Sequence, residues 1–584
     1  MNTVPKTLRI DGAAKQSVET GRTRLLVAGA VFALGFATIA ARLVLITLGA
    51  DPEAPRLAVA VAHTPPVVSR ADVVDRNGVL LATSLPTVGL FADTRKIADP
   101  KRAARRLTAV LPGLDPIEVS VKLSSGLSFV WLSRTLTPHQ QAEVNRLGIP
   151  GLEFQPSERR VYPQGRLAVH VLGATDVDNR GLTGIERSFD ERLSQGRLPL
   201  PLSLDVRVQH VLAAELRRAM HEFDAIGAGG AVLDVRTGEV LAMVSYPDFE
   251  PNDIGSADAD VRFNRMTLGV YELGSTFKLF NTALALDSGK VGIGSRFDAT
   301  HPLRVARFAI RDYKPEARWL SVAEILLHSS NIGSAQMAME VGGERQRGFL
   351  EKLGLLQPLA IELPETGEPL YPSVWRDINT MTIAFGHGIA VSPMHLINGV
   401  AAVINGGILH SPTLLRRDPA DAPAGRRVVS PGTSETMRRL MRMVVTDGTG
   451  GNAKAKGYLV GGKTGTAEKQ VAGRYVRKAL VSSFVGAFPM TDPRYVVLAL
   501  LDEPKGNKKT FGYATGGWVA APVVGRTIER IGPMLGVTPQ AEDDPRVIEA
   551  LHIDIPEGRG PDLRREVHRG TPAPRGAEPQ LASF

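Results

Sequence analysis

The sequence predicts a multi-domain α/β protein that follows one N-terminal membrane helix. The chain has 584 residues, which is too long for one ordinary hydrophobic core, so two or more domains are expected. Hydrophobic residues make up 43% and charged residues 22%, so neither a disordered chain nor a protein with many membrane spans is expected. Within 204–535, strand-like runs at both ends flank several helical patterns, which predicts helices packed on a sheet.

The membrane helix is predicted at 25–48, which reads LLVAGAVFALGFATIAARLVLITL. As a helix, this run crosses a bilayer core of about 30 Å. Only Arg42 interrupts it, near one end, where its guanidinium reaches the headgroups. Cations dominate 1–24, which predicts a cytoplasmic tail and places the rest of the chain outside the cytoplasmic (inner) membrane, as a single-pass protein. The alternative is a cleaved signal peptide, with Thr38 and Ala40 before the cut.

The rest of the chain divides into three parts. The first, 49–203, alternates short apolar runs with turn signals, as in 73–81 (VVDRNGVLL), and reads as a β-rich, non-catalytic domain. The second, 204–535, contains a hairpin at 229–246, and the third, 536–584, is rich in Pro, Arg and Gly towards its end and is expected to be a flexible tail. Further helices are predicted at 205–223, 278–286, 322–327, 332–340 and 435–445, and further strands at 482–488 and 495–501.

Composition excludes several kinds of chemistry. The chain has no cysteine, so thiolate catalysis, disulfides and cysteine-ligated zinc are excluded. The histidines show no metal-ligand spacing, and neither a phosphate loop nor a dinucleotide fingerprint is present, so no metal or cofactor is expected. The net charge is +9, but the cations are spread along the chain without a nucleic-acid-binding motif. We therefore expect no nucleic acid partner.

A serine and a lysine stand three residues apart in 274–278 (GSTFK). On a helix, this spacing puts the Ser275 hydroxyl and the Lys278 amine on one face, a turn apart. A serine hydroxyl becomes a nucleophile when a base takes its proton, and a lysine kept neutral by burial and nearby cations is such a base. Taken alone, the simpler interpretation is a helix-capping serine with a solvated lysine.

Two further motifs follow in order: 329–331 (SSN) in a predicted loop between helices, and 463–466 (KTGT) before a predicted strand. With 274–278 they resemble the signature of the penicillin-binding proteins, which is SxxK, then SxN, then KTG. The resemblance implies the transpeptidase fold of that family, an antiparallel sheet with helices. Each motif alone also has a purely structural interpretation, as a helix cap or a surface turn.

The resemblance implies catalytic roles for three residues. Ser275 would attack an acyl group, Lys278 would be its base, and Ser329 would relay a proton between Lys278 and the reacting amine. The oxyanion hole would be formed by the backbone amides of Ser275 and Thr466.

The remaining motif residues are expected to bind substrate. The amide of Asn331 would hold a peptide group. Lys463, with the hydroxyls of Thr464 and Thr466, would bind the carboxylate that ends a peptide, and Gly465 would let the strand lie close to the ligand.

The N-terminal region resembles the non-catalytic pedestal (dimerisation-type) domain of class B penicillin-binding proteins. Its arginines and acids are expected to form an ion-pair network that joins two domains, and not to act in catalysis. The matching positions are 70–72 (RAD), 75–78 (DRNG), 160–163 (RVYP), Gly165, Gly181 and 184–186 (GIE).

Within class B, Asn331 in the second motif and 385–391 (FGHGIAV) followed by Ser392 and Pro393 resemble division-specific, FtsI-type enzymes more than elongation-specific ones. His387 lies between two glycines, which indicates a tight loop under the active site and not a general base.

The resemblance therefore implies a penicillin-sensitive peptidoglycan D,D-transpeptidase that cross-links stem peptides ending in D-Ala-D-Ala during septal wall synthesis. It implies β-lactams as covalent inhibitors and an FtsW-type glycosyltransferase and other division proteins as partners. Three alternatives stay open: an elongation-specific transpeptidase, a hydrolase of the D,D-carboxypeptidase or β-lactamase type, and a non-enzymatic β-lactam sensor or division scaffold.

Overall fold

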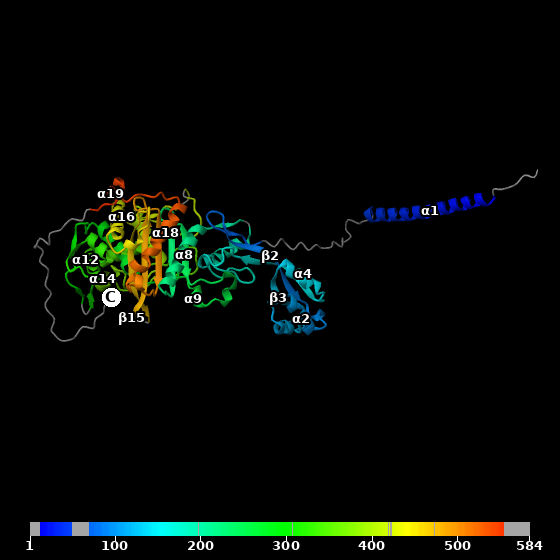
Figure 1. The fold of residues 1–584 in the computed structure, drawn as a ribbon, viewed down its shortest axis with the longest axis horizontal. Coiled ribbons are helices and arrows are strands. Elements are labelled where there is room, and N and C mark those ends of the chain that lie inside the picture. The colour runs from blue at the N-terminus through cyan, green and yellow to red at the C-terminus, as the bar shows by residue number, and fades with distance from the viewer. Residues whose placement is uncertain are drawn as a thin grey trace, which may run out of the picture. The chain divides into compact units, whose positions relative to one another are not determined.

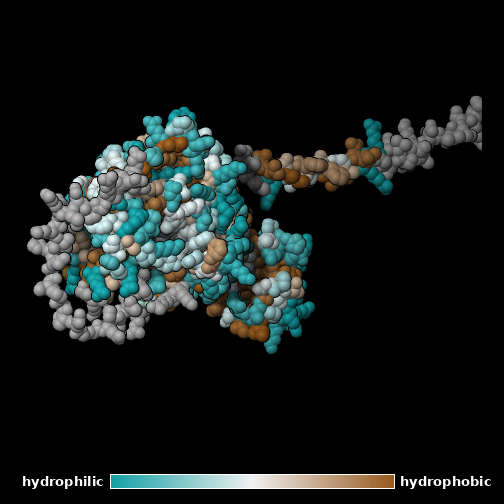
Figure 2. All heavy atoms as spheres, turned by 60° about the vertical axis from the view of Figure 1, so that its left-hand side comes forward, coloured by the Kyte–Doolittle hydropathy of each residue, from teal (hydrophilic) through white to brown (hydrophobic). Residues whose placement is uncertain are grey.

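The protein is represented by a computed structural model that describes residues 12–48 and 69–553, apart from 197, 306–307, 419, 421–422 and 472–473. Two compact units are present, Met1–Val68 and Ser69–Phe584. In the first, α1 (Gly12–Leu48) is one continuous helix. Its segment Arg22–Val44 has a mean hydropathy of 2.0, is entirely exposed and is long enough to cross a membrane (Figure 2). The predicted apolar run thus forms a helix that begins before residue 25.

The second unit is built around a five-stranded antiparallel sheet in the order β14-β15-β16-β6-β7 (Figure 1). Its strands are β6 (Gly227–Asp234), β7 (Val240–Tyr246), β14 (Gly461–Val471), β15 (Arg474–Phe488) and β16 (Tyr495–Asp502). The predicted hairpin at 229–246 is β6 and β7, and both later strands are present, β15 beginning eight residues earlier than expected. The first two strands of this sheet, β6 and β7, are separated in sequence from the last three, β14 to β16, by most of the helices described between residues 204 and 535.

Helices cover both faces of this sheet, and successive side chains of β16 pack alternately against the two layers of helices. Val496, Leu498 and Leu500 belong to the core that contains α10, α15 and α16, whereas Val497, Ala499 and Leu501 belong to the core that contains α8 and α18. Successive side chains of a strand point to opposite faces, so a strand covered on both sides is apolar throughout. The predicted α/β architecture is confirmed as a three-layer arrangement.

Of the main helices of this part, α8, α10, α11, α12 and α16 match predicted ranges, whereas α15 and α18 were not predicted. These helices are α8 (Val206–Glu222), α10 (Lys278–Asp287), α11 (Val322–His328), α12 (Asn331–Val341), α15 (Pro393–Ile404), α16 (Pro431–Thr446) and α18 (Ala521–Met534). Shorter elements complete it: η2 (Pro251–Ser256), α9 (Ala259–Arg262), β8 (Arg296–Asp298), β9 (Leu303–Val305), β10 (Phe308–Ile310), β11 (Trp319–Ser321), α13 (Gly343–Lys352), α14 (Asp377–Ile383), β12 (Ile408–Leu409), β13 (Arg426–Arg427), η5 (Gly451–Ala453), η6 (Lys508–Thr510) and α17 (Gly516–Val519).

The predicted tail is partly ordered. Within 536–553, α19 (Pro545–Leu551) packs on α16, with Val547 buried and the Ala550 carbonyl accepting a hydrogen bond from Arg439. The expectation of a flexible tail is therefore wrong for this stretch, because apolar residues of α19 cover an apolar part of α16. The remaining 554–584 lie outside the described residues.

The N-terminal part of the second unit contains more helix than expected. Its strands are β1 (Val73–Val74), β2 (Leu80–Ala92), β3 (Val130–Leu136), β4 (Leu152–Val161) and β5 (Leu200–Pro201), and its helices are η1 (Thr94–Lys96), α2 (Pro100–Val110), α3 (Pro116–Leu123), α4 (Pro138–Arg146), α5 (Val169–Leu172), α6 (Gly184–Ser188) and α7 (Asp190–Ser194). The strand–turn–strand predicted at 73–81 is present as β1 and β2. Helices α2, α3 and α4 enclose a separate small core with β2 and β3.

A buried ion-pair network holds this part together. Glu186 is fully buried and accepts hydrogen bonds from Arg70 Nε and Arg160 Nε, both at 2.7 Å. Arg70 also donates to Asp190 at 2.7 Å. All four side chains lie before residue 204, so this part of the predicted network does not itself join two domains. Two short arginine–carboxylate contacts neutralise a carboxylate that is removed from water.

Other residues of the same motif group do connect to the part of the chain after residue 204. The Asp75 carboxylate accepts from the Val206 amide at 3.1 Å, and the Asn77 side chain donates to Asp205 at 3.1 Å. Both contacts are made at the N-terminus of α8, where a carboxylate satisfies a free amide. The predicted connection between the parts of the chain before and after residue 204 is therefore present, and it is made by residues 75–77.

We predict that Glu186→Gln lowers the local free energy of unfolding of 69–203 by about 3 to 5 kcal/mol, because two buried guanidinium groups lose their counter-charge. Native-state amide hydrogen exchange of β1 and β4 in the full chain measures this. Glu153→Gln, at a half-exposed carboxylate paired with Lys96, is the matched control and should change the same value by less than about 1 kcal/mol. Equal effects of the two substitutions would contradict a special role for the buried network.

Candidate active site

Ser275 lies on the 3-10 helix η3 (Gly274–Phe277), which continues directly into α10. The predicted spacing places the two groups in contact: Lys278 Nζ donates to Ser275 Oγ at 2.8 Å. Gly274 has φ +56°, and a side chain there would come within 2.6 Å of the Thr466 carbonyl. Only glycine suits this conformation and this distance, so the turn that presents Ser275 depends on it.

Lys278 is the centre of the site. Its side chain is fully buried, yet its amine also donates to the Ser329 carbonyl at 2.9 Å, to Ser329 Oγ at 3.2 Å and to Asn331 Oδ1 at 2.7 Å. Ser329 ends α11 in the left-handed conformation, at φ +59°, and Asn331 begins α12. The predicted loop between two helices thus brings both residues to one amine.

Lys463 reaches the same hydroxyl from the sheet. It lies on β14, is fully buried, and its amine donates to Ser329 Oγ at 2.9 Å and to Thr464 Oγ1 at 3.2 Å. The KTGT motif was expected before a strand, but it lies within β14, which begins at Gly461. Ser329 Oγ is therefore held between two amines, 51 and 134 residues away in sequence.

The other two residues of this motif lie against the protein's own backbone. Thr466 Oγ1 accepts from the Gly516 amide at 3.0 Å. A side chain at Gly465 would come within 2.6 Å of the Leu273 carbonyl and 2.5 Å of Ser483 Oγ. The structure thus gives Gly465 a reason that the sequence did not indicate: it makes room for the turn that carries the nucleophile.

The electrostatics favour a neutral base. Burial, and then the positive charge of Lys463, lower the pKa of Lys278 well below its ordinary value, while Asp312 opposes this shift. Burial also lowers the pKa of Lys463, to about 7. Desolvation disfavours a charged amine, and a second cation nearby does the same. Lys278 is thus suited to accept a proton near neutral pH.

Asp312 is a supporting residue that sequence reasoning missed. Its carboxylate accepts from Ser330 Oγ at 2.7 Å, from the Asn331 amide at 2.5 Å and from the Ile332 amide at 3.0 Å. It therefore caps the N-terminus of α12 and fixes the SSN loop. No local pattern identifies it, because the contacts join positions 18 to 20 residues apart.

The loop at 385–391 packs under the nucleophile, as predicted from its glycines. A side chain at Gly386 would collide with the Gly274 carbonyl, and Gly388 donates its amide to Glu272 at 2.8 Å. Burial, and then the charge of Lys278, lower the pKa of His387 to about 4. His387 is therefore neutral at physiological pH and packs beside the Phe385 ring.

The geometry joins the Ser275 hydroxyl, the buried amine of Lys278 and the Ser329 hydroxyl in one network, which suits transfer of an acyl group through a covalent serine intermediate. Among the described residues, no group of three or more His, Cys, Asp or Glu side chains is arranged to hold a metal ion.

Comparison with known proteins gives the same assignment. Residues 228–529 match the family of the penicillin binding protein transpeptidase domain, and residues 65–197 match the penicillin-binding protein dimerisation domain. The chain is 43% identical to a probable peptidoglycan D,D-transpeptidase FtsI of Caulobacter vibrioides, over 81% of this chain and 82% of that protein. It is 30% identical to the peptidoglycan D,D-transpeptidase FtsI of Escherichia coli, over 81% and 85%.

Solved structures agree. The transpeptidase domain of penicillin-binding protein 3 from Burkholderia pseudomallei superposes with a TM-score of 0.53 at 34% identity, over 58% of this chain and 98% of that one. The matched ranges include all three motifs and the pedestal positions. The chain therefore belongs to the penicillin-binding protein transpeptidase family and carries that family's dimerisation domain.

Proposed function

We propose that the protein is a septal peptidoglycan D,D-transpeptidase that works through an acyl-enzyme on Ser275. The observation that carries this proposal is the contact of 2.8 Å between Ser275 Oγ and the fully buried amine of Lys278. Membership of the penicillin-binding family and the names of the relatives support the stem peptide as substrate and β-lactams as inhibitors.

In the first half-reaction, Ser275 Oγ attacks the carbonyl carbon between the two terminal D-alanines, and Lys278 takes the hydroxyl proton. The C–N bond then breaks, the proton passes through Ser329 to the leaving amine, and D-alanine departs. In the second, an amine of a neighbouring stem attacks the ester carbon and gives its proton to Lys278. The C–O bond to Ser275 then breaks, and Lys278 returns this proton to Ser275 Oγ. The product is a peptide cross-link.

The remaining motif residues are assigned to binding. Lys463, Thr464 and Thr466 would hold the terminal carboxylate, Asn331 would hold a peptide group, and Gly465 would keep β14 against the nucleophile turn. The amides of Ser275 and Thr466 would form the oxyanion hole. This assignment is supported by the backbone of Gly274, which lies against Thr466 in the structure.

We further propose the cellular arrangement. Residues 1–24 would be cytoplasmic, α1 would span the membrane within 25–48, and 49–203 and 204–535 would be pedestal and catalytic domains on the outer side. The cation-rich N-terminus and the exposed apolar helix support this orientation. The FtsI-type relatives support a division role, in which an FtsW-type glycosyltransferase and other division proteins would be the partners.

The direct test of the reaction offers the full chain a D-Ala-D-Ala stem peptide or thioester with a D-amino acid acceptor. We expect most acyl groups to reach the acceptor, and no turnover from Ser275→Ala. If water received nearly all of them, the enzyme would be a hydrolase. Depletion in cells tests the division role: filaments are expected, whereas round cells would assign the protein to elongation.

We predict that Lys278→Ala abolishes labelling by a fluorescent penicillin while leaving the fold intact. The reason is that Ser275 loses its base, whereas alanine suits a helix. Gel fluorescence measures labelling, and circular dichroism measures folding. Lys290→Ala, an exposed lysine after the same helix, is the control and should label normally. Normal labelling of Lys278→Ala would remove Lys278 from the base role.

We predict a bell-shaped pH profile of kcat/KM. The acidic limb rises with pH because Lys278 must lose its proton, and it reaches its plateau well below the ordinary lysine pKa. The alkaline limb falls above about pH 7 because Lys463 must keep its proton to bind a carboxylate. A substrate whose terminal carboxylate is converted to an amide should lose the alkaline limb only. Persistence of that limb would contradict carboxylate binding by Lys463.

A further inference from the structure

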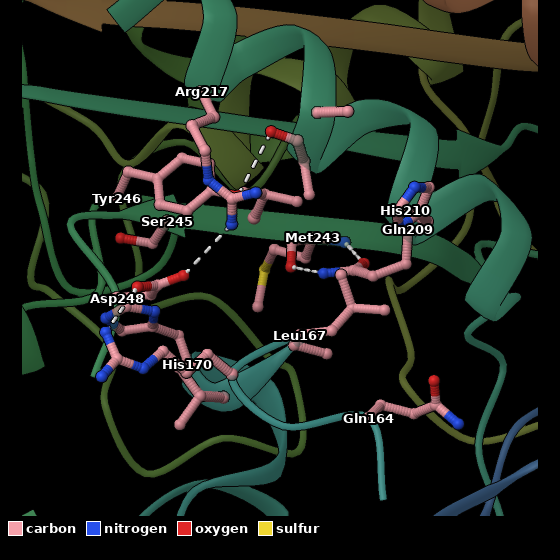
Figure 3. Close-up of a pocket in the computed structure, with 16 residues that line it drawn as sticks. Gln164, Leu167, His170, Gln209, His210, Arg217, Met243, Ser245, Tyr246 and Asp248 are labelled. Atoms are coloured by element: carbon pink, nitrogen blue, oxygen red, sulfur yellow. Dashed lines mark hydrogen bonds and ion pairs between the residues drawn. The ribbon is translucent and has the colours of Figure 1, made fainter. Parts of the chain in front are cut away.

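A cleft of about 390 Å³ opens between the segment 164–170 and the edge strand β7, beside α8 (Figure 3). Nothing in the proposed reaction uses it. The sheet order places β7 at the edge opposite to β14, which carries Lys463. The cleft is therefore separate from the active site, although the same sheet borders both, and its volume lies within the range of about 300 to 1,000 Å³ typical of binding pockets.

The backbone of Ser245 in β7 faces this cleft without a hydrogen-bond partner among the described residues. Met243 points its amide and carbonyl away from β6, where Gln209 pairs with both at 2.8 Å (Figure 3). Along a strand, the backbone groups of successive residues point alternately towards one neighbouring strand and away from it. The amide and carbonyl of Ser245, two residues after Met243, therefore also point away from β6. Among the described residues, nothing pairs with them on that side, although Ser245 is only 3% exposed. Buried backbone groups without a partner are rare and costly.

Gln209 shows what kind of group the edge accepts. Its side-chain amide offers one donor and one acceptor to Met243, as the peptide group of a neighbouring strand does. Nearer the start of β7, Leu241 is paired with the Asp205 amide and Val240 with the Thr413 carbonyl. Within the part of the chain that the structure describes, the edge is thus closed up to Met243 and open at Ser245, where the cleft lies.

Two arginine side chains, those of Arg166 and Arg217, lie at the end of this open edge. Arg217 lies over the Tyr246 ring at 5.1 Å and 3.6 Å from Asp248, which is also 3.8 Å from Arg166 (Figure 3). Both arginine side chains are 56% exposed, and Arg166 also lies 3.7 Å from Glu250. These ion-pair distances are longer than hydrogen bonds, so the guanidinium groups are able to re-pair with an incoming carboxylate.

We propose that this cleft binds an extended peptide segment of a partner protein. The segment pairs its backbone with the amide and carbonyl of Ser245, as an added strand, and places an acidic side chain against Arg166 and Arg217. Burial lowers the pKa of His170, at the base of the cleft, to about 4, so the cations that meet the acid are the two arginines. A pocket lined by backbone groups, Gln209 and arginines suits a polar strand better than an apolar ligand.

The test uses the full-length protein in its own membrane. A photo-crosslinking amino acid replaces Ala214, a partly exposed residue of α8 that lines the cleft, or Gln164 on the opposite wall. The same amino acid at Arg218, exposed on α8 and not part of the lining, is the control. We expect crosslinks from 214 and 164, but not from 218, to one protein segment that contains Asp or Glu. Penicillin labelling verifies that each variant is folded.

Charge reversal then tests the arginine contact. Arg217→Glu should lower the crosslinking yield about tenfold, as expected for loss of a charge-assisted contact. Arg236→Glu, an equally exposed arginine paired with Asp492, should leave the yield unchanged. The synthetic peptide of the crosslinked segment should slow amide hydrogen exchange of Ser245, and its Asp or Glu→Ala version should bind about tenfold more weakly.

Three results would overturn the proposal. They are crosslinks to peptidoglycan or to no protein, a yield that Arg217→Glu does not change, and no change in Ser245 exchange on adding the peptide. The last would leave ordered water as the partner of that backbone. Because penicillin labelling is measured in the same cells, failure here is distinct from failure of the transpeptidase assignment.

Discussion

The buried amine of Lys278 is the constraint on which the site depends. It makes contacts with Ser275 on the turn at 274–277 and with Ser329 and Asn331 on the loop at 329–331, and it has no exposed surface. An amine in such a place is stable only if it is neutral or fully hydrogen bonded. Four oxygen atoms lie within hydrogen-bond distance of Lys278 Nζ, so each of the three protons of its charged form would have a partner. The same desolvation that makes burial costly makes the amine a base. Position and reactivity thus have one physical cause.

Close backbone packing brings those segments together. Gly274, Gly386 and Gly465 each stand where a side chain would come within 2.6 Å of a carbonyl oxygen on another segment. The nucleophile turn is therefore enclosed between β14 and the loop at 385–391 without intervening side chains. Such contacts leave little freedom for Ser275 to move, and pre-positioning of a nucleophile is itself a large part of catalysis.

Features that depend on local sequence were predictable, whereas most features that depend on tertiary contacts were not. The three motifs were identifiable because acyl transfer requires those residue types, and the hairpin and α8 were identifiable from periodicity. Helices α2, α3 and α4 were missed, although each begins with Asp-Pro or Thr-Pro, a recognisable start signal. Asp312 had no local signal, because it contacts residues 18 to 20 positions away that it meets only after folding.

The two edges of the catalytic sheet face the same physical problem. An edge strand has unpaired amides and carbonyls, which the protein must cover or use. At β7 the chain covers most of them with Gln209, Asp205 and Thr413. The outer edge of β14 instead faces the nucleophile turn, where the backbone of Gly274 lies against Thr466. In the proposed reaction the β14 edge binds the substrate. Among the described residues, the opening at Ser245 is the place where the β7 edge remains able to receive a strand.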